Sequence, residues 1–150
     1  MKNKICLISS HGGHLHELSE AVAGLDAPCY WVTYRTVHTI QRFKDCPHYF
    51  VLDPHLSKWK YVVNAVQSLW HLLKERPRVI ISTGAGIAIP TMILGKYLFR
   101  CKLIFIESAA NVTTPSHTAK FIYPHADLFL VQWDELRRSD FPKAITVGVL

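Results

Sequence analysis

The sequence has no pair of cysteines at the C-x-x-C spacing, and its four cysteines are scattered along 150 residues. Zinc clusters and thioredoxin-like redox sites use such close pairs, so both classes are disfavoured. Cys6 and Cys29 stand in apolar, strand-like runs. We therefore expect reduced, buried thiols in a cytosolic protein at Cys6, Cys29, Cys46 and Cys101.

A long apolar run is also missing. A membrane-spanning helix needs about 20 apolar residues, and the longest candidate, residues 87–99, is interrupted by Pro90 and Lys96. The first apolar run, residues 5–8, is too short for the core of a signal peptide. We expect a cytoplasmic chain that can lie on a bilayer but does not cross it.

No stretch rich in glycine, serine or proline divides the chain, and no internal repeat is present. A length of 150 residues then fits one domain, residues 1–150, that can bury a core. The formal net charge of +6 predicts an anionic partner. Nucleic acid is the weakest choice, because the lysines and arginines are dispersed and accompany no base-stacking aromatic motif.

Short apolar runs alternate with helix-length segments along the chain. Several runs are continuously apolar, as in parallel strands covered by helices on both faces. The pattern predicts an α/β fold with a doubly wound, mostly parallel, Rossmann-like sheet, in which ligands bind at the carboxyl ends of the strands. The expected strands are residues 4–9, 30–34, 49–52, 79–82, 103–106, 128–131 and 145–150.

The clearest helix covers residues 57–75 and ends before Pro77. Its apolar side chains recur every three or four residues, which predicts an amphipathic helix. Two interpretations stay open: the apolar face covers the sheet, or it lies on a membrane with its neighbouring cations. These cations are Lys58, Lys60, Lys74 and Arg76.

The loop after the first strand, SSHGGHLHEL at residues 9–18, combines two glycines with three histidines. Gly12 and Gly13 allow the backbone to turn N–H groups outward at the start of the next helix, where a phosphate is favoured. His14 would stand beside that phosphate, and Glu17 would cap the helix or orient an imidazole. A tight turn with solvated histidines is the alternative. The spacing H-x-x-H-x-H-E disfavours a metal site.

Two further loops follow strands of the same predicted sheet. STGAGIAIP, residues 82–90, places Gly84 and Gly86 in a second glycine turn, with close packing as the alternative role. Glu107 follows the next apolar strand and would emerge at the mouth of the cleft or act as a cap. The polar loop behind it offers donors for sugar or phosphate oxygens at Asn111, Ser116, His117 and Thr118.

The order of these motifs resembles a known family. GGH, then STGAG, IES and PSHTAKFIYPHADLFLVQW, are similar to the PssD-like polysaccharide-biosynthesis glycosyltransferase subunits. These are bacterial relatives of the membrane-anchoring subunit of the split UDP-GlcNAc transferase in eukaryotic N-glycan assembly. The likeness covers nearly the whole chain. Its last block is the most specific, whereas GGH is shared with wider GT-B enzymes such as MurG.

The resemblance implies the N-terminal, acceptor-binding domain of a GT-B glycosyltransferase, completed by a donor-binding subunit in a heterodimer. It implies transfer from a UDP-sugar to a polyprenyl-diphosphate-linked saccharide at the inner membrane face, for capsule or exopolysaccharide, with no cofactor. His14 is the expected general base of an inverting reaction and Glu107 its rival. The expected acceptor- or phosphate-binding residues are His11, Gly12, Gly13, Gly84, Gly86, Asn111, Ser116, His117 and Thr118.

The eukaryotic relatives carry an N-terminal membrane helix, whereas this chain begins almost at its first strand. Membrane attachment is therefore expected from the helix at residues 57–75, or from Lys96, Arg100 and Lys102. A different class of function is also open. In this alternative the chain is a non-catalytic docking subunit, which recruits its partner to the membrane and enhances an activity resident there.

Overall fold

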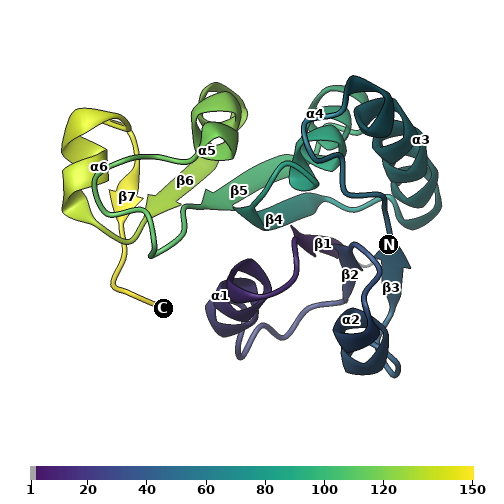
Figure 1. The fold of residues 1–150 in the computed structure, drawn as a ribbon. Helices are drawn as coiled ribbons and strands as arrows, with labels where there is room; N and C mark the ends of the chain where they lie inside the picture. The colour runs from purple at the N-terminus through teal and green to yellow at the C-terminus, as the bar shows by residue number, and fades with distance from the viewer. Residues whose placement is uncertain (1–2) are drawn as a thin grey trace.

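Seven parallel strands form one sheet in the order β3-β2-β1-β4-β5-β6-β7, with helices on both faces (Figure 1). The computed structural model describes residues 3–150. The strands are β1 (Ile5–Ser9), β2 (Cys29–Thr33), β3 (His48–Phe50), β4 (Val79–Gly84), β5 (Lys102–Ile106), β6 (Leu128–Val131) and β7 (Ile145–Thr146). The predicted doubly wound, Rossmann-like α/β fold is confirmed.

Helices α1 and α2 lie on one face of the sheet, and α3, α4 and α5 lie on the other (Figure 1). The helices are α1 (Gly13–Ala21), α2 (Val37–Arg42), α3 (Lys58–Glu75), α4 (Ala88–Leu98), α5 (His117–Ile122) and α6 (Asp134–Ser139), with a 3-10 turn η1 (Tyr123–His125). Pro90 falls in the first turn of α4, where a proline removes no helical hydrogen bond. Within residues 3–150, no helix is long and apolar enough to cross a bilayer.

The strand order changes direction between β1 and β4, which are neighbours although β2 and β3 separate them in the sequence. In doubly wound sheets the carboxyl ends of two such strands open a crevice, because their following helices leave on opposite faces. Here α1 follows β1 on one face and α4 follows β4 on the other. The fold therefore marks the ends of β1 and β4 as the place for a ligand.

The predicted strands match the observed ones to within two residues at each end, except for the last strand. The strand expected at residues 145–150 is only Ile145–Thr146, because β7 is an edge strand that pairs only with the end of β6. The strand expected at residues 49–52 is His48–Phe50. Of the thiols, Cys6 and Cys101 are buried and Cys29 is half-buried, but the expectation of burial is wrong for Cys46, which is exposed in the turn before β3.

Helix α3 turns its polar side toward the core. Asn64, Ser68 and His71 are at most 1% exposed, whereas Trp59 is 74% and Val66 64% exposed. The interpretation that the apolar face covers the sheet is therefore wrong. The apolar face of α3 is exposed to solvent, so this face can contact a partner or a membrane.

A closed hydrogen-bond network makes this orientation possible. The Asn64 amide donates to the Leu52 carbonyl at 2.8 Å, and the Ser68 hydroxyl donates to the Asn64 side chain at 3.0 Å. The Thr91 hydroxyl of α4 donates to Ser68 at 2.8 Å. His71 Nδ1 lies 3.2 Å from the Tyr30 hydroxyl of β2. Because these buried groups satisfy one another, the polar side of α3 can pack inward.

We predict that this network makes stability depend on pH through His71. Burial lowers the pKa of His71 from 6.5 to about 4, against a smaller opposing effect of Glu75. The unfolded chain takes up a proton as pH falls through 6.5, but the folded protein does not. The contribution of His71 to the free energy of unfolding should therefore decline by about 3 kcal/mol between pH 6.5 and 4, and this contribution should change no further below pH 4. Urea unfolding across this range measures it.

His71→Gln supplies the control, because an amide does not titrate in this range. The variant should be less stable than the wild type at pH 7 but should lose much less stability between pH 6.5 and 4. An unchanged slope in the variant would assign the pH dependence to other groups.

Candidate active site

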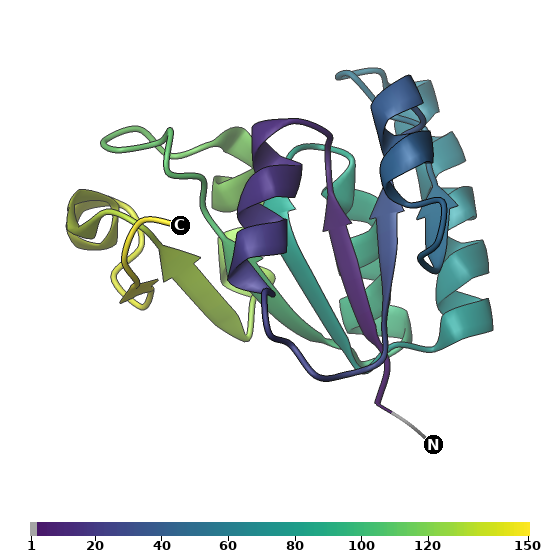
Figure 2. The same cartoon turned by 90° about the horizontal axis from the view of Figure 1, so that it is seen from below.

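Three loops meet at the carboxyl ends of β1, β4 and β5 (Figure 2). His14, in the first turn of α1, contacts Thr83 at the end of β4, with Nδ1 of the ring 3.0 Å from the Thr83 carbonyl oxygen. Glu17, one turn later, accepts a hydrogen bond from the Ala109 amide in the β5–α5 loop at 2.7 Å. These contacts hold the three loops around one crevice, at the switch point of the sheet.

The glycine loop opens the N-terminus of α1. Gly12 adopts φ 76° and ψ −135°, a conformation that other residues rarely reach. Within residues 3–150 no side chain caps this helix, so its first backbone N–H groups can bind an outside acceptor. A Cβ added at Gly13 would meet nothing within 4 Å, so the space in front of the helix is open. This geometry suits a phosphate, which both the free amides and the helix dipole stabilise.

The imidazole of His14 is half-buried and held in one tautomer. Its Nδ1 faces the Thr83 carbonyl, which can only accept, so Nδ1 carries the hydrogen. The Thr83 hydroxyl donates back to the His14 carbonyl at 2.6 Å. Nε2 then keeps its lone pair, and no hydrogen bond to Nε2 occurs within residues 3–150. A fixed imidazole with a free basic nitrogen is the arrangement that a general base needs.

The second glycine turn shapes the same crevice. Gly84 has φ 115°, and a Cβ there would lie 3.5 Å from Phe105 and 3.6 Å from the His14 ring. A Cβ at Gly86 would lie 2.7 Å from the Tyr61 hydroxyl of α3. Gly84 therefore sets the backbone beside His14, whereas Gly86 lets α3 pack closely against the loop.

Glu107 is turned into its own loop instead of the crevice. The side chain is 1% exposed and accepts hydrogen bonds from the amides of Ser108 at 3.0 Å and Ser116 at 2.9 Å. The Asn111 side chain and the Ser116 hydroxyl donate to it as well, each at 3.1 Å or less. The carboxylate thus stabilises the loop at residues 108–116. Because its oxygens already accept hydrogen bonds from that loop, His14 is favoured over Glu107 as the general base.

Glu17 has a role that its position in the sequence did not indicate. It is 8% exposed and accepts hydrogen bonds from the Ser108 hydroxyl and from the Gln132 side chain, besides the Ala109 amide. Oε2 of this carboxylate is buried without a partner in the described chain. Within residues 3–150, the carboxylate makes no capping hydrogen bond to α1 and no hydrogen bond to an imidazole; it joins α1 to the loops after β5 and β6.

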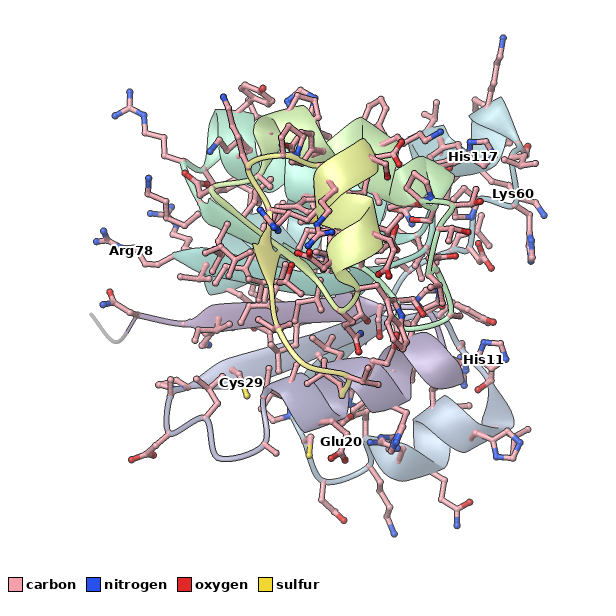
Figure 3. The ribbon with its side chains drawn as sticks, turned by 90° about the vertical axis from the view of Figure 1, so that its left-hand side faces the viewer. His11, Glu20, Cys29, Lys60, Arg78 and His117 are labelled. Atoms are coloured by element: carbon pink, nitrogen blue, oxygen red, sulfur yellow. The ribbon has the colours of Figure 1, made fainter. Side chains whose placement is uncertain are left out.

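The remaining predicted residues are distributed unevenly. Asn111 and Ser116 donate hydrogen bonds to the Glu107 carboxylate. Thr118 is 7% exposed, on the inner side of α5. His117, the first residue of α5, is exposed. Figure 3 shows His117 at the same end of the molecule as His11, opposite Arg78, which precedes β4. Of this group, His117 has the side chain most open to a ligand.

The three histidines of the glycine loop diverge. His11 lies against the Tyr34 hydroxyl, His14 faces Thr83, and His16 is exposed on α1. In the part of the chain that the structure describes, no three histidine, cysteine, aspartate or glutamate side chains gather as metal ligands. The structure brings His11, Gly12, Gly13, His14 and Gly84 together at the switch point.

This fold is that of the N-terminal domain of GT-B glycosyltransferases. The structure resembles Acinetobacter baumannii MurG with a TM-score of 0.71 and 12% identity, over 98% of this chain and 44% of that one. It also resembles a UDP-N-acetylglucosamine 2-epimerase from Rickettsia bellii, with a TM-score of 0.73 and 13% identity, over 92% of this chain and 41% of that one. At this identity the likeness shows the fold alone.

The chain belongs to the family described as "Oligosaccharide biosynthesis protein Alg14 like", which matches residues 51–150. A Saccharomyces cerevisiae relative named UDP-N-acetylglucosamine transferase subunit ALG14 is 31% identical over 139 aligned positions, covering 77% of this chain and 58% of the relative. The Debaryomyces hansenii protein of the same name is 26% identical, covering 99% of this chain and 76% of the relative. The chain thus spans only part of its relatives.

Proposed function

We propose that this chain is the acceptor-binding subunit of a two-component, inverting glycosyltransferase. The observation that carries the proposal is the fixed His14 with its free Nε2, beside the open N-terminus of α1. The names of the relatives, UDP-N-acetylglucosamine transferase subunits, support UDP-GlcNAc as the donor. The family description supports an oligosaccharide product, for which we propose a lipid-diphosphate-linked acceptor.

In the proposed reaction, an acceptor hydroxyl attacks the anomeric carbon of the donor sugar. Its proton passes to Nε2 of His14, and the bond from the sugar to the UDP oxygen breaks, with the electron pair leaving on UDP. Attack from the face opposite UDP inverts the anomeric centre. The amides and dipole of α1, behind Gly12 and Gly13, stabilise the charge on the departing diphosphate, so fixed dipoles supply the positive potential.

The second domain of the enzyme would come from a partner. The chain aligns with 44% of the MurG chain, and we propose that this part is one of the two domains of a GT-B enzyme. We propose that a separate subunit binds the nucleotide-sugar, and that the crevice at β1 and β4 faces it in a heterodimer.

The outer stripe of α3 supports attachment to a membrane. Its members, between 51% and 74% exposed, are Trp59, Val62, Val66, Trp70 and Leu73, and Leu56, 94% exposed, precedes the helix. Lys58, Lys60 and Lys74 stand beside it on the same helix. Each cation close to an anionic leaflet adds about 1 kcal/mol to binding. We therefore propose that α3 lies on the cytoplasmic face of the membrane.

The other group of cations expected to bind a membrane, Lys96, Arg100 and Lys102, is less suited to membrane binding. Lys96 and Lys102 both pair with Asp127, at 2.6 and 3.1 Å. Partial burial alone would raise the pKa of Asp127, but hydrogen bonds from Lys96, the Leu103 amide and Lys102 outweigh it and lower the pKa to about 2. Both lysines are thus held by one carboxylate within the fold, whereas Lys58 and Lys60 beside the outer stripe make no ion pair within residues 3–150.

We predict that Trp59→Glu weakens binding to vesicles containing phosphatidylglycerol by about tenfold or more, because it removes an apolar contact and adds a repelled charge. Sedimentation with vesicles measures the effect. Leu98→Glu is the matched control, since Leu98 is a 62% exposed apolar residue on α4, away from the stripe. Equal losses in both variants would contradict attachment through α3.

The proposed function is tested by reconstitution. The tagged chain is used to isolate its partner from detergent-solubilised membranes of the source cells, and mass spectrometry identifies that partner. The purified pair should transfer GlcNAc from UDP-GlcNAc to a short-chain lipid-diphosphate sugar, and neither chain alone should do so. A purified, stoichiometric pair that transfers no sugar from any UDP-sugar would contradict the proposal.

We also predict that Gly13→Ala lowers kcat/KM of the pair by about tenfold, because its methyl group enters the space where the diphosphate departs. The backbone at Gly13 tolerates alanine, so thermal stability should not fall. Gly148→Ala is the control, as that glycine also has open space around it but lies near the C-terminus. Full activity of Gly13→Ala would remove the glycine loop from the diphosphate site.

A second candidate function is a docking subunit without a catalytic role. The outward apolar face of α3 favours this function, because docking to a membrane or a partner through that face does not require catalytic residues at the crevice. The partner alone, at saturating acceptor, would then turn over as fast as the pair.

The narrower PssD-like assignment, with a role in capsule or exopolysaccharide synthesis, stays a prediction. The relatives that match are named for a UDP-N-acetylglucosamine transferase. Analysis of surface polysaccharide in cells lacking this chain would test it.

A further inference from the structure

A groove runs along one edge of the sheet between β3 and α3, and we call it the edge groove. Its apolar end, of about 410 Å³, is lined by Tyr49, Phe50, Val51, Val66, Gln67 and Trp70. Its polar end, of about 500 Å³, shares Phe50, Val51 and Gln67 with the apolar end and reaches Tyr34, Arg35, Asp53 and Lys60. Both volumes are typical of small-molecule sites. The shared residues make the two ends one depression with an apolar half and a charged half.

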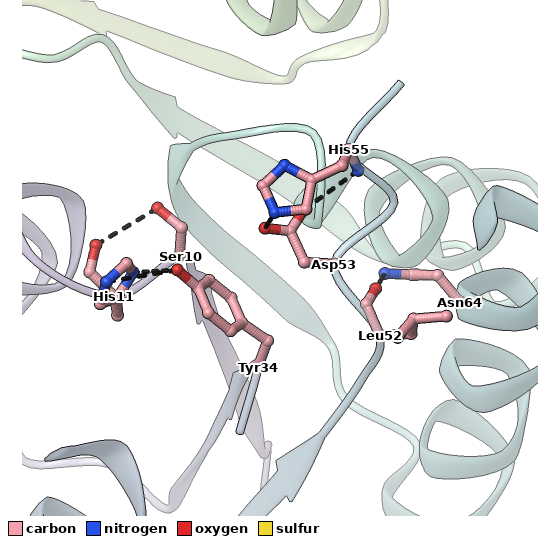
Figure 4. A network of polar contacts seen from close by, with 7 residues as sticks. All are labelled: Ser10, His11, Tyr34, Leu52, Asp53, His55 and Asn64. Carbon is pink, nitrogen blue, oxygen red and sulfur yellow. Dashed lines mark hydrogen bonds and ion pairs between the residues drawn. The ribbon is translucent and has the colours of Figure 1, made fainter. Parts of the chain in front are cut away.

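The polar end carries an excess of positive charge. Asp53 pairs with His55, whose Nε2 lies 3.2 Å from the carboxylate (Figure 4). Among residues 3–150, neither Arg35 nor Lys60 makes an ion pair, and both are exposed. A guanidinium and an ammonium group lining one depression are typical ligands of phosphate oxygens.

The floor of the groove is rigid before any ligand binds. The Leu52 amide donates to the Gln67 side chain at 2.7 Å. The Leu52 carbonyl accepts from the Asn64 side chain at 2.8 Å, as Figure 4 shows. Both partners belong to α3, so the segment after β3 is tied to that helix through both backbone polar groups of one residue, Leu52. A preformed site loses less entropy when a ligand binds.

The two ends of the edge groove lie next to different parts of the molecule. Val66 and Trp70 line the apolar end and also belong to the outer stripe of α3. At the polar end, the Tyr34 hydroxyl contacts His11, next to the glycine loop (Figure 4). The groove therefore leads from the surface that we place on the membrane to the candidate active site.

We propose that the edge groove binds the lipid part of the acceptor, with the first part of its chain in the apolar end and its diphosphate against Arg35 and Lys60. This inference rests on the proposed function for the identity of the acceptor. Transfer from a UDP-sugar to a lipid-diphosphate saccharide brings two diphosphates to one enzyme. The N-terminus of α1 receives the departing one, and the edge groove holds the one that stays.

Binding of farnesyl diphosphate, a short and soluble lipid diphosphate, to the purified chain tests the proposal by isothermal titration calorimetry. Pyrophosphate and farnesol each represent one half of this ligand. Farnesyl diphosphate should bind about tenfold or more tightly than either half, because it fills both ends of the groove. The measurement needs neither the partner nor sugar transfer.

Variants locate the site. Val66→Asp, on the outward side of α3, should weaken farnesyl diphosphate about tenfold and leave pyrophosphate unchanged. The double variant Arg35→Gln with Lys60→Gln should weaken both ligands. Trp59→Ser is the control, because Trp59 belongs to the outer stripe but does not line the groove. It should bind farnesyl diphosphate as the wild type does.

The proposal would be overturned by no binding of farnesyl diphosphate or by binding that the groove variants do not weaken. Equal binding of dihexanoyl phosphatidylglycerol would also overturn it, because it would mark a general phospholipid site. A dimer that Val66→Asp dissociates would assign the groove to a second copy instead. Sugar transfer by the reconstituted pair with an unchanged acceptor KM in Val66→Asp would leave the proposed function standing while the groove assignment fails.

Discussion

Replacing His14 by alanine should lower sugar transfer by the reconstituted pair about 10²- to 10⁴-fold, the range that a positioned general base contributes. The Thr83 carbonyl holds the hydrogen on Nδ1, which leaves Nε2 to take the proton of the acceptor hydroxyl. The fold should survive, because the substitution removes one hydrogen bond worth about 1 kcal/mol. Initial rates at saturating donor and acceptor, together with thermal midpoints, measure both effects.

Two variants separate proton transfer from positioning. His14→Asn retains an amide that can donate to Thr83 but lacks a basic nitrogen, so it should be as inactive as the alanine variant. His16→Ala changes an exposed histidine in the same turn of α1 and should keep the wild-type rate. Near-normal turnover by His14→Ala would remove this residue from the mechanism.

Replacing Glu107 by alanine should destabilise the protein by about 4 kcal/mol, the largest effect on stability that we predict. The side chain is 1% exposed, and its loss leaves the amides of Ser108 and Ser116 and the Asn111 side chain without their acceptor. Glu107→Gln keeps one acceptor oxygen but turns an NH₂ group toward donors, so about 2 kcal/mol is expected. Urea unfolding at pH 7 measures both variants.

The stability of these variants shows whether Glu107 stabilises its loop or acts as the general base. Glu20→Ala, which removes an exposed carboxylate from α1, should leave stability within about 0.5 kcal/mol of the wild type. A Glu107→Gln variant that is as stable as the wild type but has lost transfer a hundredfold or more would make Glu107 the catalytic base and His14 its companion.

Much of the candidate site could be predicted because its signals are local. Gly12 and Gly13 lie three and four residues after the end of an apolar strand, and a helix begins at Gly13. The turn, the free amides and the neighbouring imidazole then follow from consecutive positions. The same reasoning placed Gly84 at the end of a second strand, and the parallel sheet brought both turns to one edge.

The roles of the carboxylates could not be predicted in this way. Glu17 accepts from Ala109, 92 positions later, and from Gln132, 115 positions later. Glu107 stands at the end of a strand as expected, but the Ser116 amide, nine positions away, decides that it faces its own loop. Spacing in the sequence places a carboxylate on an element, whereas its partners come from segments that meet only in the folded chain.

The sequence by itself determined the parallel α/β architecture, since continuously apolar strands and intervening amphipathic segments can satisfy their backbone groups and bury their apolar faces in few other ways. It also determined that one side of α3 is apolar. Only the tertiary structure decided where that side points. Leu52, Thr91 and Tyr30 supply the hydrogen-bond partners of the buried Asn64, Ser68 and His71. Because those partners belong to three different segments, periodicity along the helix contains no sign of them, and the edge groove exists only because α3 packs with its polar side inward.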